Sequence, residues 1–375
     1  MKSFPRRRSS LTNGRSTMKV SPNRLQQLGW RPFFQQQLSL EALEQLKPAR
    51  IVAQHRSELL LESESGNCKI IPPRMNGEPL QVTVGDWVLL DTDHRFHSLL
   101  QRQSQLARKA AGSKLEQQLI AANIDTLFIV SSLNQDFKLN RIERYLVLAH
   151  EAQVEPVILL TKADLCESQD MIDEIMQQVQ KLDTSMSVLA LNGLDRDSLK
   201  QLSTWTGTGK TLGFVGSSGV GKSTLVNLLL GDVVMDTQDI REDDSKGRHT
   251  TTGRSLHEIP SSELIHGGWV MDTPGMRELQ IAFAESGIDA TFSDITELAE
   301  QCKFNDCQHR NEPGCAVLEA IDRGDLELRR LQSYQKLLRE EAHNSASLAE
   351  QREHDKSLGK LYRSVQSANR KNKQF

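Results

Sequence analysis

The residues best suited to chemistry lie in one glycine-rich segment, from Gly216 to Ser223. Its spacing is G-x-x-x-x-G-K-S, and it stands between an apolar run that ends at Val215 and the helix-forming residues 225–230. Glycines let backbone N–H groups turn inward around an anion, and the helix N-terminus adds its positive dipole end. In such a loop Lys222 reaches the β- and γ-phosphates, and the Ser223 hydroxyl binds Mg²⁺. The segment predicts a nucleoside triphosphate site. Its candidate phosphate-binding residues are Gly216, Ser217, Ser218, Gly219, Val220, Gly221, Lys222, Ser223 and Thr224.

A second candidate is the tetrapeptide Thr161, Lys162, Ala163 and Asp164, directly after the apolar run 157–160. The Asp164 carboxylate can accept from guanine N1–H and the 2-amino group, two donors that adenine does not offer, so it can discriminate strongly. The tetrapeptide alone also fits an ordinary helix N-cap. In the same chain as a phosphate loop, at a strand end, it favours guanine recognition.

Two further segments extend the predicted nucleotide site. Residues 190–193, Ala-Leu-Asn-Gly, follow the next predicted strand, where a backbone N–H can meet guanine O6. Asp272 to Gly275 closes an apolar strand that ends at Met271. There Asp272 would hold Mg²⁺ through water, and the Gly275 N–H would meet the γ-phosphate. An Asp-Pro-Gly turn without a ligand is the alternative, and the apolar strand before it argues against that alternative.

Residues 247–252, Gly-Arg-His-Thr-Thr-Thr, are a candidate first switch loop. One threonine would bind Mg²⁺; we select Thr251, and its neighbours Thr250 and Thr252 stay open.

The hydrolytic step needs a group that orients the attacking water. Met276 stands where many GTPases place a glutamine for this purpose, and an apolar side chain cannot serve. His249 has suitable acid–base chemistry and is the candidate catalytic residue, together with Lys222. An exposed histidine without a catalytic role is the alternative.

The spacing Cys302-x₄-Cys307-x-His309-x₅-Cys315 supplies four metal ligands. A Cys₃His set fits closed, tetrahedral zinc, which leaves no open position for catalysis. The alternative is a chance cluster of reduced cysteines.

The secondary structure predicted around these residues changes along the chain from helices to short strands, then to alternating strands and helices, and finally to helices. Residues 25–46 read as a helical lead-in, and after residue 286 the chain reads as helical around the Cys/His cluster. Short alternating strands favour a small barrel of the oligonucleotide-binding type, with or without a ligand; these are residues 51–53, 58–61, 68–71, 82–84 and 87–90. Strands alternating with helices then predict a parallel sheet with ligands at the strand ends. Its strands are residues 126–132, 157–160, 188–191 and 268–271, and its helices are residues 140–153, 171–182 and 199–205.

Composition sets the class of protein. The 375 residues carry a formal net charge of −3, so no global field indicates a nucleic-acid partner. The first 31 residues and those from Lys356 onward are basic and contain no acid, which suits a phosphate backbone or a solvated tail about equally. We expect no membrane span and no secretory signal, and five cysteines favour a reducing cytoplasm.

With these motifs in view, the chain resembles the circularly permuted ribosome-assembly GTPases of the RsgA/YjeQ family, from about residue 49 to 340. A conventional GTPase meets the phosphate loop first and the guanine motif last. Here the guanine motif comes first, as it does when old termini are joined and the chain is cut elsewhere. The second switch then leads directly into the C-terminal domain, and loss of the γ-phosphate could move that domain. The resemblance implies a multidomain α/β protein with four segments: a basic N-terminal extension (1–48), an OB-fold barrel (49–112), a permuted GTPase domain (113–285) and a helical zinc domain with a basic tail (286–375).

The resemblance also implies function. We expect a cytoplasmic, monomeric GTP hydrolase that uses Mg²⁺ with GTP, carries one structural Zn²⁺, and assists late maturation of the small (30S) ribosomal subunit with 16S rRNA contacts. The subunit would stimulate hydrolysis by fixing the His249 loop. The alternative is an RNA-binding protein whose nucleotide site gates affinity while hydrolysis is incidental. A small-molecule kinase is a third possibility, but no sequence feature supplies an acceptor pocket.

Overall fold

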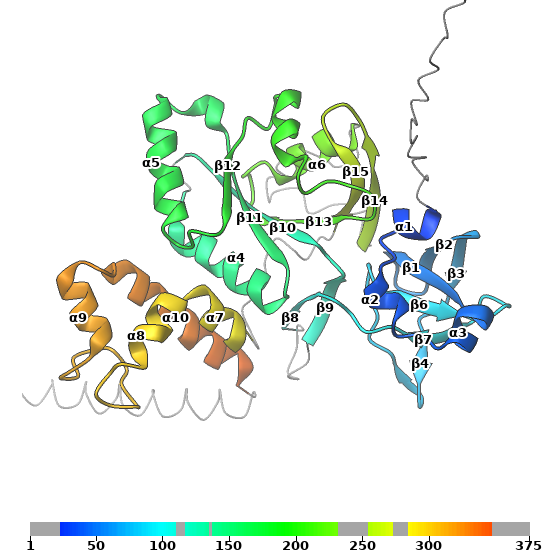
Figure 1. Cartoon of the computed structure of the whole chain (residues 1–375), viewed down its shortest axis with the longest axis horizontal. Helices are drawn as coiled ribbons and strands as arrows, with labels where there is room; N and C mark the ends of the chain where they lie inside the picture. The colour runs from blue at the N-terminus through cyan, green and yellow to red at the C-terminus, as the bar shows by residue number, and fades with distance from the viewer. Residues whose placement is uncertain (1–22, 110–116, 135–136, 232–253, 273–283, 347–375) are drawn as a thin grey trace, which may run out of the picture.

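The computed structural model describes residues 23–109, 117–134, 137–231, 254–272 and 284–346. Along the chain these form an N-terminal barrel, an α/β domain and a helical C-terminal module (Figure 1). The predicted residues His249, Thr251 and Gly275 lie outside the described part of the chain.

The α/β domain contains the predicted parallel sheet. Strands β12 (Ser187–Ala190), β11 (Glu155–Thr161), β10 (Thr126–Ser132), β13 (Thr211–Gly216) and β15 (His266–Asp272) lie side by side in this order and run parallel. Strand β14 (Arg254–Ser261) joins the far side of β15 in the antiparallel direction. Apolar runs predicted the central strands correctly, because both faces of this sheet are covered.

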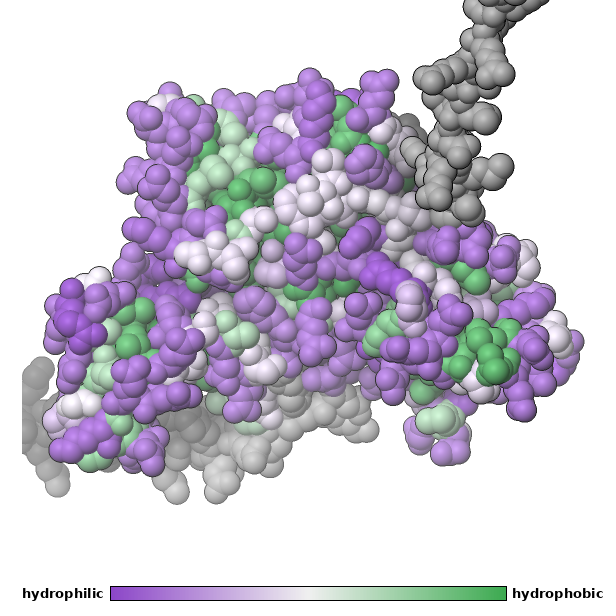
Figure 2. Space-filling model, viewed as in Figure 1, coloured by the Kyte–Doolittle hydropathy of each residue, from purple (hydrophilic) through white to green (hydrophobic). Residues whose placement is uncertain are grey.

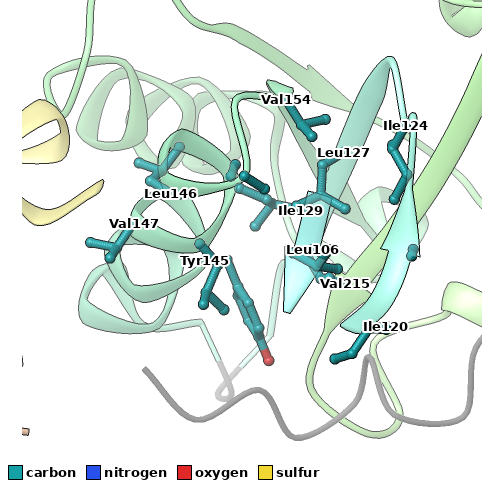
Figure 3. Close-up of a cluster of buried hydrophobic side chains, with 14 of the residues drawn as sticks. Leu106, Ile120, Ile124, Leu127, Ile129, Tyr145, Leu146, Val147, Val154 and Val215 are labelled. Atoms are coloured by element: carbon teal, nitrogen blue, oxygen red, sulfur yellow. The ribbon is translucent and has the colours of Figure 1, made fainter. Parts of the chain in front are cut away.

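Helices cover the two faces of the sheet. Alternate residues of β10 lie in two different hydrophobic cores, one on each face of the sheet. Leu127 and Ile129 pack with α4 (Leu139–Glu151) and α5 (Gln169–Gln180), as Figure 3 shows for α4. Phe128 and Val130 pack with α6 (Lys222–Leu230) and the 3₁₀ helix η2 (Arg196–Leu202).

The N-terminal barrel is built around β1 (Lys47–Gln54), which pairs with β2 (Leu59–Ser63) and β6 (Trp87–Leu90). Strand β3 (Gly66–Ile70) pairs with β2, and β7 (Phe96–Leu99) pairs with β6. Strands β4 (Arg74–Met75) and β5 (Glu78–Pro79) form a separate small hairpin.

The predicted strand at residues 82–84 is wrong. The segment is buried, but local contacts replace a strand ladder. The Thr83 N–H donates to the Asp86 carboxylate at 2.8 Å, and the Gly85 N–H donates to Ile51 O at 2.8 Å. Asp86 is fully buried and paired with Arg102 at 2.7 Å, so its carboxylate organises this turn.

The helical lead-in consists of α1 (Arg24–Gln27), α2 (Pro32–Gln35) and α3 (Leu40–Gln45). It is anchored by Phe34, whose ring centroid lies 5.7 Å from that of Trp87 in the barrel. Figure 2 shows a mostly hydrophilic face with an apolar patch over α3, where Leu40 and Leu43 are exposed.

Arg50 joins the lead-in, the barrel and the α/β domain. Its guanidinium is buried and donates to Leu28 O at 2.7 Å, Thr211 Oγ1 at 2.9 Å and Asn123 O at 3.2 Å. Burial lowers the pKa of Arg50 to about 10, which leaves the group charged at neutral pH. These contacts fix the beginning of β13, the strand that leads into the phosphate loop.

The hairpin of β8 (Gln105–Lys109) and β9 (Gln117–Ala122) and strand β14 were not predicted from sequence. In β14 the buried apolar residues, Leu256 and Ile259, are three positions apart. The strand therefore lacks the period-two pattern that identifies a half-buried strand.

The C-terminal module contains α7 (Glu285–Thr291), α8 (Ser293–Ala299), α9 (Ala316–Arg323) and α10 (Leu328–Ser345), in agreement with the helical prediction. Helix α7 lies against α4; a Cβ on Gly287 would come within 2.3 Å of Val147 O. Among the described residues, no helix combines the length and apolar composition that crossing a bilayer requires.

Candidate functional site

The predicted phosphate loop connects β13 to α6 at the carboxyl edge of the parallel sheet. Gly216 adopts φ 147°, and a Cβ there would lie 2.3 Å from Val130 O, so a larger residue would push the loop off β10. Gly221 adopts φ 97° and caps α6. Lys222 folds back over the loop and donates to Gly216 O at 2.8 Å and to Ser217 O. The loop thus combines a helix N-terminus with a cation, the arrangement that an anionic phosphate requires.

The guanine motif is bonded directly to the phosphate loop. Thr161, the last residue of β11, is buried, and its Oγ1 donates to Val220 O at 2.6 Å. Lys162 then takes a left-handed conformation, φ 62° and ψ 34°, and turns the chain into η1 (Ala163–Leu165). Asp164 is exposed at this edge, where a base could reach it.

The loop after β12 lies beside the same motif. The Leu191 N–H donates to Leu160 O at 2.8 Å, and the Ala163 N–H reaches Leu191 O at 3.4 Å. Gly193 faces Leu225 of α6, whose Cδ2 would lie 3.8 Å from a Cβ on this glycine. The structure therefore brings residues 161–164, 190–193 and 216–224 together, as the sequence predicts.

Asp272 ends β15, two strands from β10 on the same edge of the sheet, and is half-buried. Ser223 lies in the first turn of α6. A hydroxyl and a carboxylate are oxygen ligands of the kind that Mg²⁺ prefers, so these two residues fit the predicted metal.

Tyr145 is a neighbour of the phosphate loop that sequence reasoning missed. It projects from α4 (Figure 3), Ser217 is near enough to its phenol to influence its pKa, and burial raises that pKa. Within residues 140–153 it occupies an apolar helix position, so its sequence context gives no signal of this contact.

The four predicted zinc ligands converge in the C-terminal module. The ligand atoms of Cys302, Cys307, His309 and Cys315 all lie within 4.8 Å of one another. His309 Nδ1 lies 3.4 Å from Cys315 Sγ and 3.7 Å from Cys302 Sγ, so Nδ1 is the nitrogen that faces the cluster. Three sulfurs and one imidazole nitrogen at this spacing suit a tetrahedral zinc ion.

Glu312 shapes the loop that carries His309. Its carboxylate accepts from the N–H groups of Arg310 at 2.7 Å, Asn311 at 3.0 Å and Gln308 at 3.1 Å. These backbone hydrogen bonds hold the pKa of Glu312 down to about 2. The carboxylate thereby supports the left-handed conformation of His309, φ 55°.

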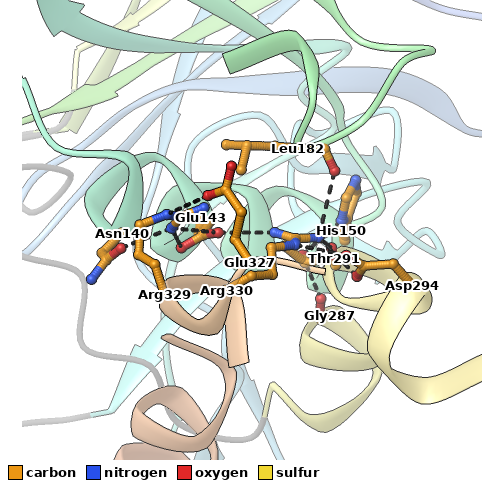
Figure 4. Close-up of polar contacts among 10 residues, drawn as sticks. All are labelled: Asn140, Glu143, His150, Leu182, Gly287, Thr291, Asp294, Glu327, Arg329 and Arg330. Atoms are coloured by element: carbon orange, nitrogen blue, oxygen red, sulfur yellow. Dashed lines mark hydrogen bonds and ion pairs between the residues drawn. The ribbon is translucent and has the colours of Figure 1, made fainter. Parts of the chain in front are cut away.

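A buried ion-pair network attaches the C-terminal module to α4 (Figure 4). Arg330 of α10 donates to Glu143 at 2.9 Å, to Asp294 at 2.9 Å and to Thr291 O at 2.8 Å. Glu143 is fully buried and also accepts from Arg329 at 3.1 Å. One helix, α4, therefore contacts the phosphate loop through Tyr145 and the C-terminal module through Glu143.

Known proteins resemble this chain in both sequence and fold. The profile of the RsgA GTPase family matches residues 99–282. The chain is 54% identical over 358 residues to "Small ribosomal subunit biogenesis GTPase RsgA 2" of Vibrio parahaemolyticus, covering 96% of this chain and 97% of that protein. It is 46% identical over 327 residues to "Small ribosomal subunit biogenesis GTPase RsgA" of Mesorhizobium japonicum, covering 86% of this chain and 91% of that protein.

Two solved structures have a similar fold. YjeQ from Thermotoga maritima aligns with a TM-score of 0.56 at 23% identity, over 79% of this chain and 98% of that one. YloQ, described as a circularly permuted GTPase, aligns with a TM-score of 0.57 at 24% identity, over 80% and 96%.

Proposed function

Since the chain belongs to the RsgA family of GTPases, we propose that it hydrolyses GTP on the small ribosomal subunit and assists the late maturation of that subunit. The observation that carries the nucleotide assignment is the 2.6 Å hydrogen bond from Thr161 to Val220. It joins a guanine-selective motif to a phosphate-binding loop. The names of the relatives supply the ribosomal partner.

In the proposed site, Asp164 accepts from guanine N1–H and the 2-amino group, and the loop at residues 190–193 presents a backbone N–H to O6. Residues 216–224 hold the phosphates, with Lys222 at the β- and γ-phosphates. Ser223, Thr251 and Asp272 hold Mg²⁺, which would draw charge from the transferring phosphoryl group. His249 orients the attacking water, and Gly275 senses the γ-phosphate.

The Cys₃His cluster holds one structural Zn²⁺ in this proposal. A metal ion bound by the loop from Cys302 to Cys315 would stabilise the module, whose helices α7 to α9 are short, with seven or eight residues each. The module then offers a rigid surface, and the basic C-terminal residues follow it in the sequence.

We assign the partner surface to the barrel and to the C-terminal module, which flank the GTPase domain in the chain. The ligand there would be 16S rRNA, and the basic residues of both termini suit its phosphates. A monomer acting in the cytoplasm is consistent with a ribosomal substrate.

The decisive experiment compares GTP turnover of the full chain with and without purified small subunits, with large subunits as the control. Turnover that rises only with small subunits supports the proposal, and equal turnover in all three reactions refutes it. Replacing His249 by Ala tests whether hydrolysis matters: if that variant still supports subunit maturation and release, hydrolysis is incidental.

A further inference from the structure

The barrel and the nucleotide site share one continuous sheet. In the antiparallel register, Ala53 of β1 pairs with Ser255 of β14, and Ser255 pairs with Asp272 of β15. Adjacent strands lie about 4.8 Å apart, so the β1 backbone lies about 10 Å from that of Asp272. No loop or linker intervenes between the barrel strand and the proposed magnesium ligand along this row.

Strands β14 and β15 also connect the two predicted switch segments. Strand β14 begins at Arg254, two residues after Thr252, and β15 ends at Asp272, where the Asp-Thr-Pro-Gly segment begins. Because the strands are antiparallel, these two points lie at the same end of the hairpin, as the pairing of Ser255 with Asp272 shows. A movement of that end would move Arg254 and Asp272, the described residues that adjoin the two predicted segments in the chain.

Arg254 connects this end of the hairpin to β1, to β9 and to the buried turn at residues 82–86. Its Nη1 donates to Leu119 O of β9, to Thr83 Oγ1 at 3.3 Å and to Gln54 Oε1 of β1 at 3.4 Å. Burial lowers the pKa of Arg254, which agrees with a guanidinium enclosed between the hairpin and the barrel. Among the residues that the structure describes, its side-chain partners come from β1, the buried turn and β9.

Arg24 forms a second fastening from the lead-in. Its guanidinium pairs with Glu62 of β2 and with Glu258 of β14, the latter at 3.0 Å, and lies 5.5 Å from the ring centre of Trp269 on β15. The Trp269 Nε1–H donates to Gln27 O at 2.7 Å. Helix α1 thus bridges the barrel to both strands of the hairpin.

The contacts between the barrel and β14 are weaker than those between β14 and β15, so the barrel can move relative to the hairpin. Strands β1 and β14 share two register pairs, Ala53 with Ser255 and Gln54 with Arg254, whereas β14 and β15 share six. The Arg24 side chain is 29% exposed, and partly exposed ion pairs contribute little to stability. The hairpin is therefore bound more firmly to the GTPase sheet than to the barrel.

We propose that the seam, defined as β1, β14, Arg24 and Arg254, couples the nucleotide state of the GTPase domain to the barrel. Small-subunit RNA held by the barrel then regulates GTP hydrolysis through the β14–β15 hairpin. Both halves of this inference rest on the proposed nucleotide site; the regulatory half rests also on the proposed ribosomal partner, whereas the mechanical half concerns the free protein.

The mechanical half is tested by amide hydrogen exchange on the full chain without ribosomes. When a non-hydrolysable GTP analogue replaces GDP, the β1 amides of residues 47–54 should change their exchange rate by about threefold or more in the wild type. Arg254→Gln and Arg24→Gln should remove this change. Arg95→Gln, which alters an exposed ion pair on the β6–β7 turn, should keep it. Identical β1 exchange with both nucleotides in the wild type would overturn the inference.

The regulatory half uses GTP turnover with small subunits. Both seam variants should lose several-fold of the stimulation, while turnover without subunits and KM stay within about twofold of wild type. Arg24→Gln serves here even if Arg254→Gln unfolds, because Arg24 is partly exposed. Stimulation that persists fully in Arg24→Gln would overturn the regulatory half. A wild type that no subunit stimulates would refute the proposed function and leave the exchange experiment to decide the seam.

Discussion

The Thr161 hydroxyl donates to the Val220 carbonyl at 2.6 Å, so residues 59 positions apart hold the predicted guanine motif and the predicted phosphate loop together. The same hydroxyl lies 3.3 Å from Ser131 O of β10. Under the proposed function, a nucleotide that fills both motifs would meet a preformed distance between the base and phosphate subsites.

Thr161→Val tests this bond. Valine keeps the shape but leaves the Val220 carbonyl without its donor, which costs about 1–3 kcal/mol for a buried group. We expect GDP affinity, measured by titration of a fluorescent analogue, to fall about tenfold. Thr161→Ser keeps the hydroxyl and is the matched control; equal affinity in both variants would contradict the role given to Thr161.

Asp164→Asn tests base selection. The amide replaces one acceptor with a donor, so guanine loses one charge-assisted bond and meets a donor facing its own N–H. The lost charge-assisted bond and the new donor–donor contact, at about 1.5 kcal/mol each, together predict about 100-fold weaker GTP binding. Xanthosine triphosphate, which carries a carbonyl at position 2, should gain affinity. Competition among GTP, XTP and ATP measures the change, and unchanged preference for GTP would refute the assignment of Asp164.

The features that could be predicted from the sequence are those defined by residues close together in the chain. The predicted phosphate loop, the predicted guanine motif and the Cys₃His cluster each lie within a short stretch of the chain, and the parallel strands are apolar runs of four or more residues. These features depend on near neighbours in the chain, so pattern and residue type suffice to find them.

The features that were missed depend on distant partners. Strand β14 exists because β15 and β1 pair with it, and β1 lies about 200 residues earlier in the chain. Arg50 reads as one more charged residue in an alternating strand, yet it is buried among Leu28, Asn123 and Thr211. Tyr145 reads as core. In each case the partner is chosen by the tertiary fold, which a single sequence does not display.

Arg330→Met tests how the C-terminal module is attached. The change removes the closest cation from the fully buried Glu143 and leaves it with Arg329. Removing one partner of a buried pair costs about 3 kcal/mol. Chemical denaturation should show this loss, whereas Arg323→Met, which breaks an exposed pair with Asp325, should cost less than about 1 kcal/mol. Similar losses in the two variants would contradict the network as the attachment.

Removing the metal should unfold the C-terminal module specifically. We expect elemental analysis to find one zinc per chain, and a strong chelator to lower the melting temperature, because ligand binding energy becomes folding energy at such a site. Cys307→Ser should lose the zinc. Cys166→Ser, which alters a thiol outside the cluster, should retain it. Full zinc content in Cys307→Ser would remove that residue from the ligand set.

Acidification should destabilise the folded chain through His150, whose side chain joins α4 to α7. The Thr291 hydroxyl donates its proton to Gly287 O at 2.7 Å, so His150 Nδ1, 2.9 Å from the same oxygen, must donate to it. Burial lowers the pKa of His150 below 6.5, and the nearby Asp183 opposes this shift only in part. Protons therefore bind the unfolded chain more readily, and His150 costs stability as pH falls below about 6.5 toward its folded pKa.

His150→Gln keeps a donor near Thr291 but cannot take up a proton. The free energy of unfolding should fall less between pH 7.5 and pH 5.5 in this variant than in the wild type. His309 is common to both proteins and cancels in the comparison. If His150→Gln and the wild type lose stability in parallel, the pH dependence arises elsewhere in the molecule.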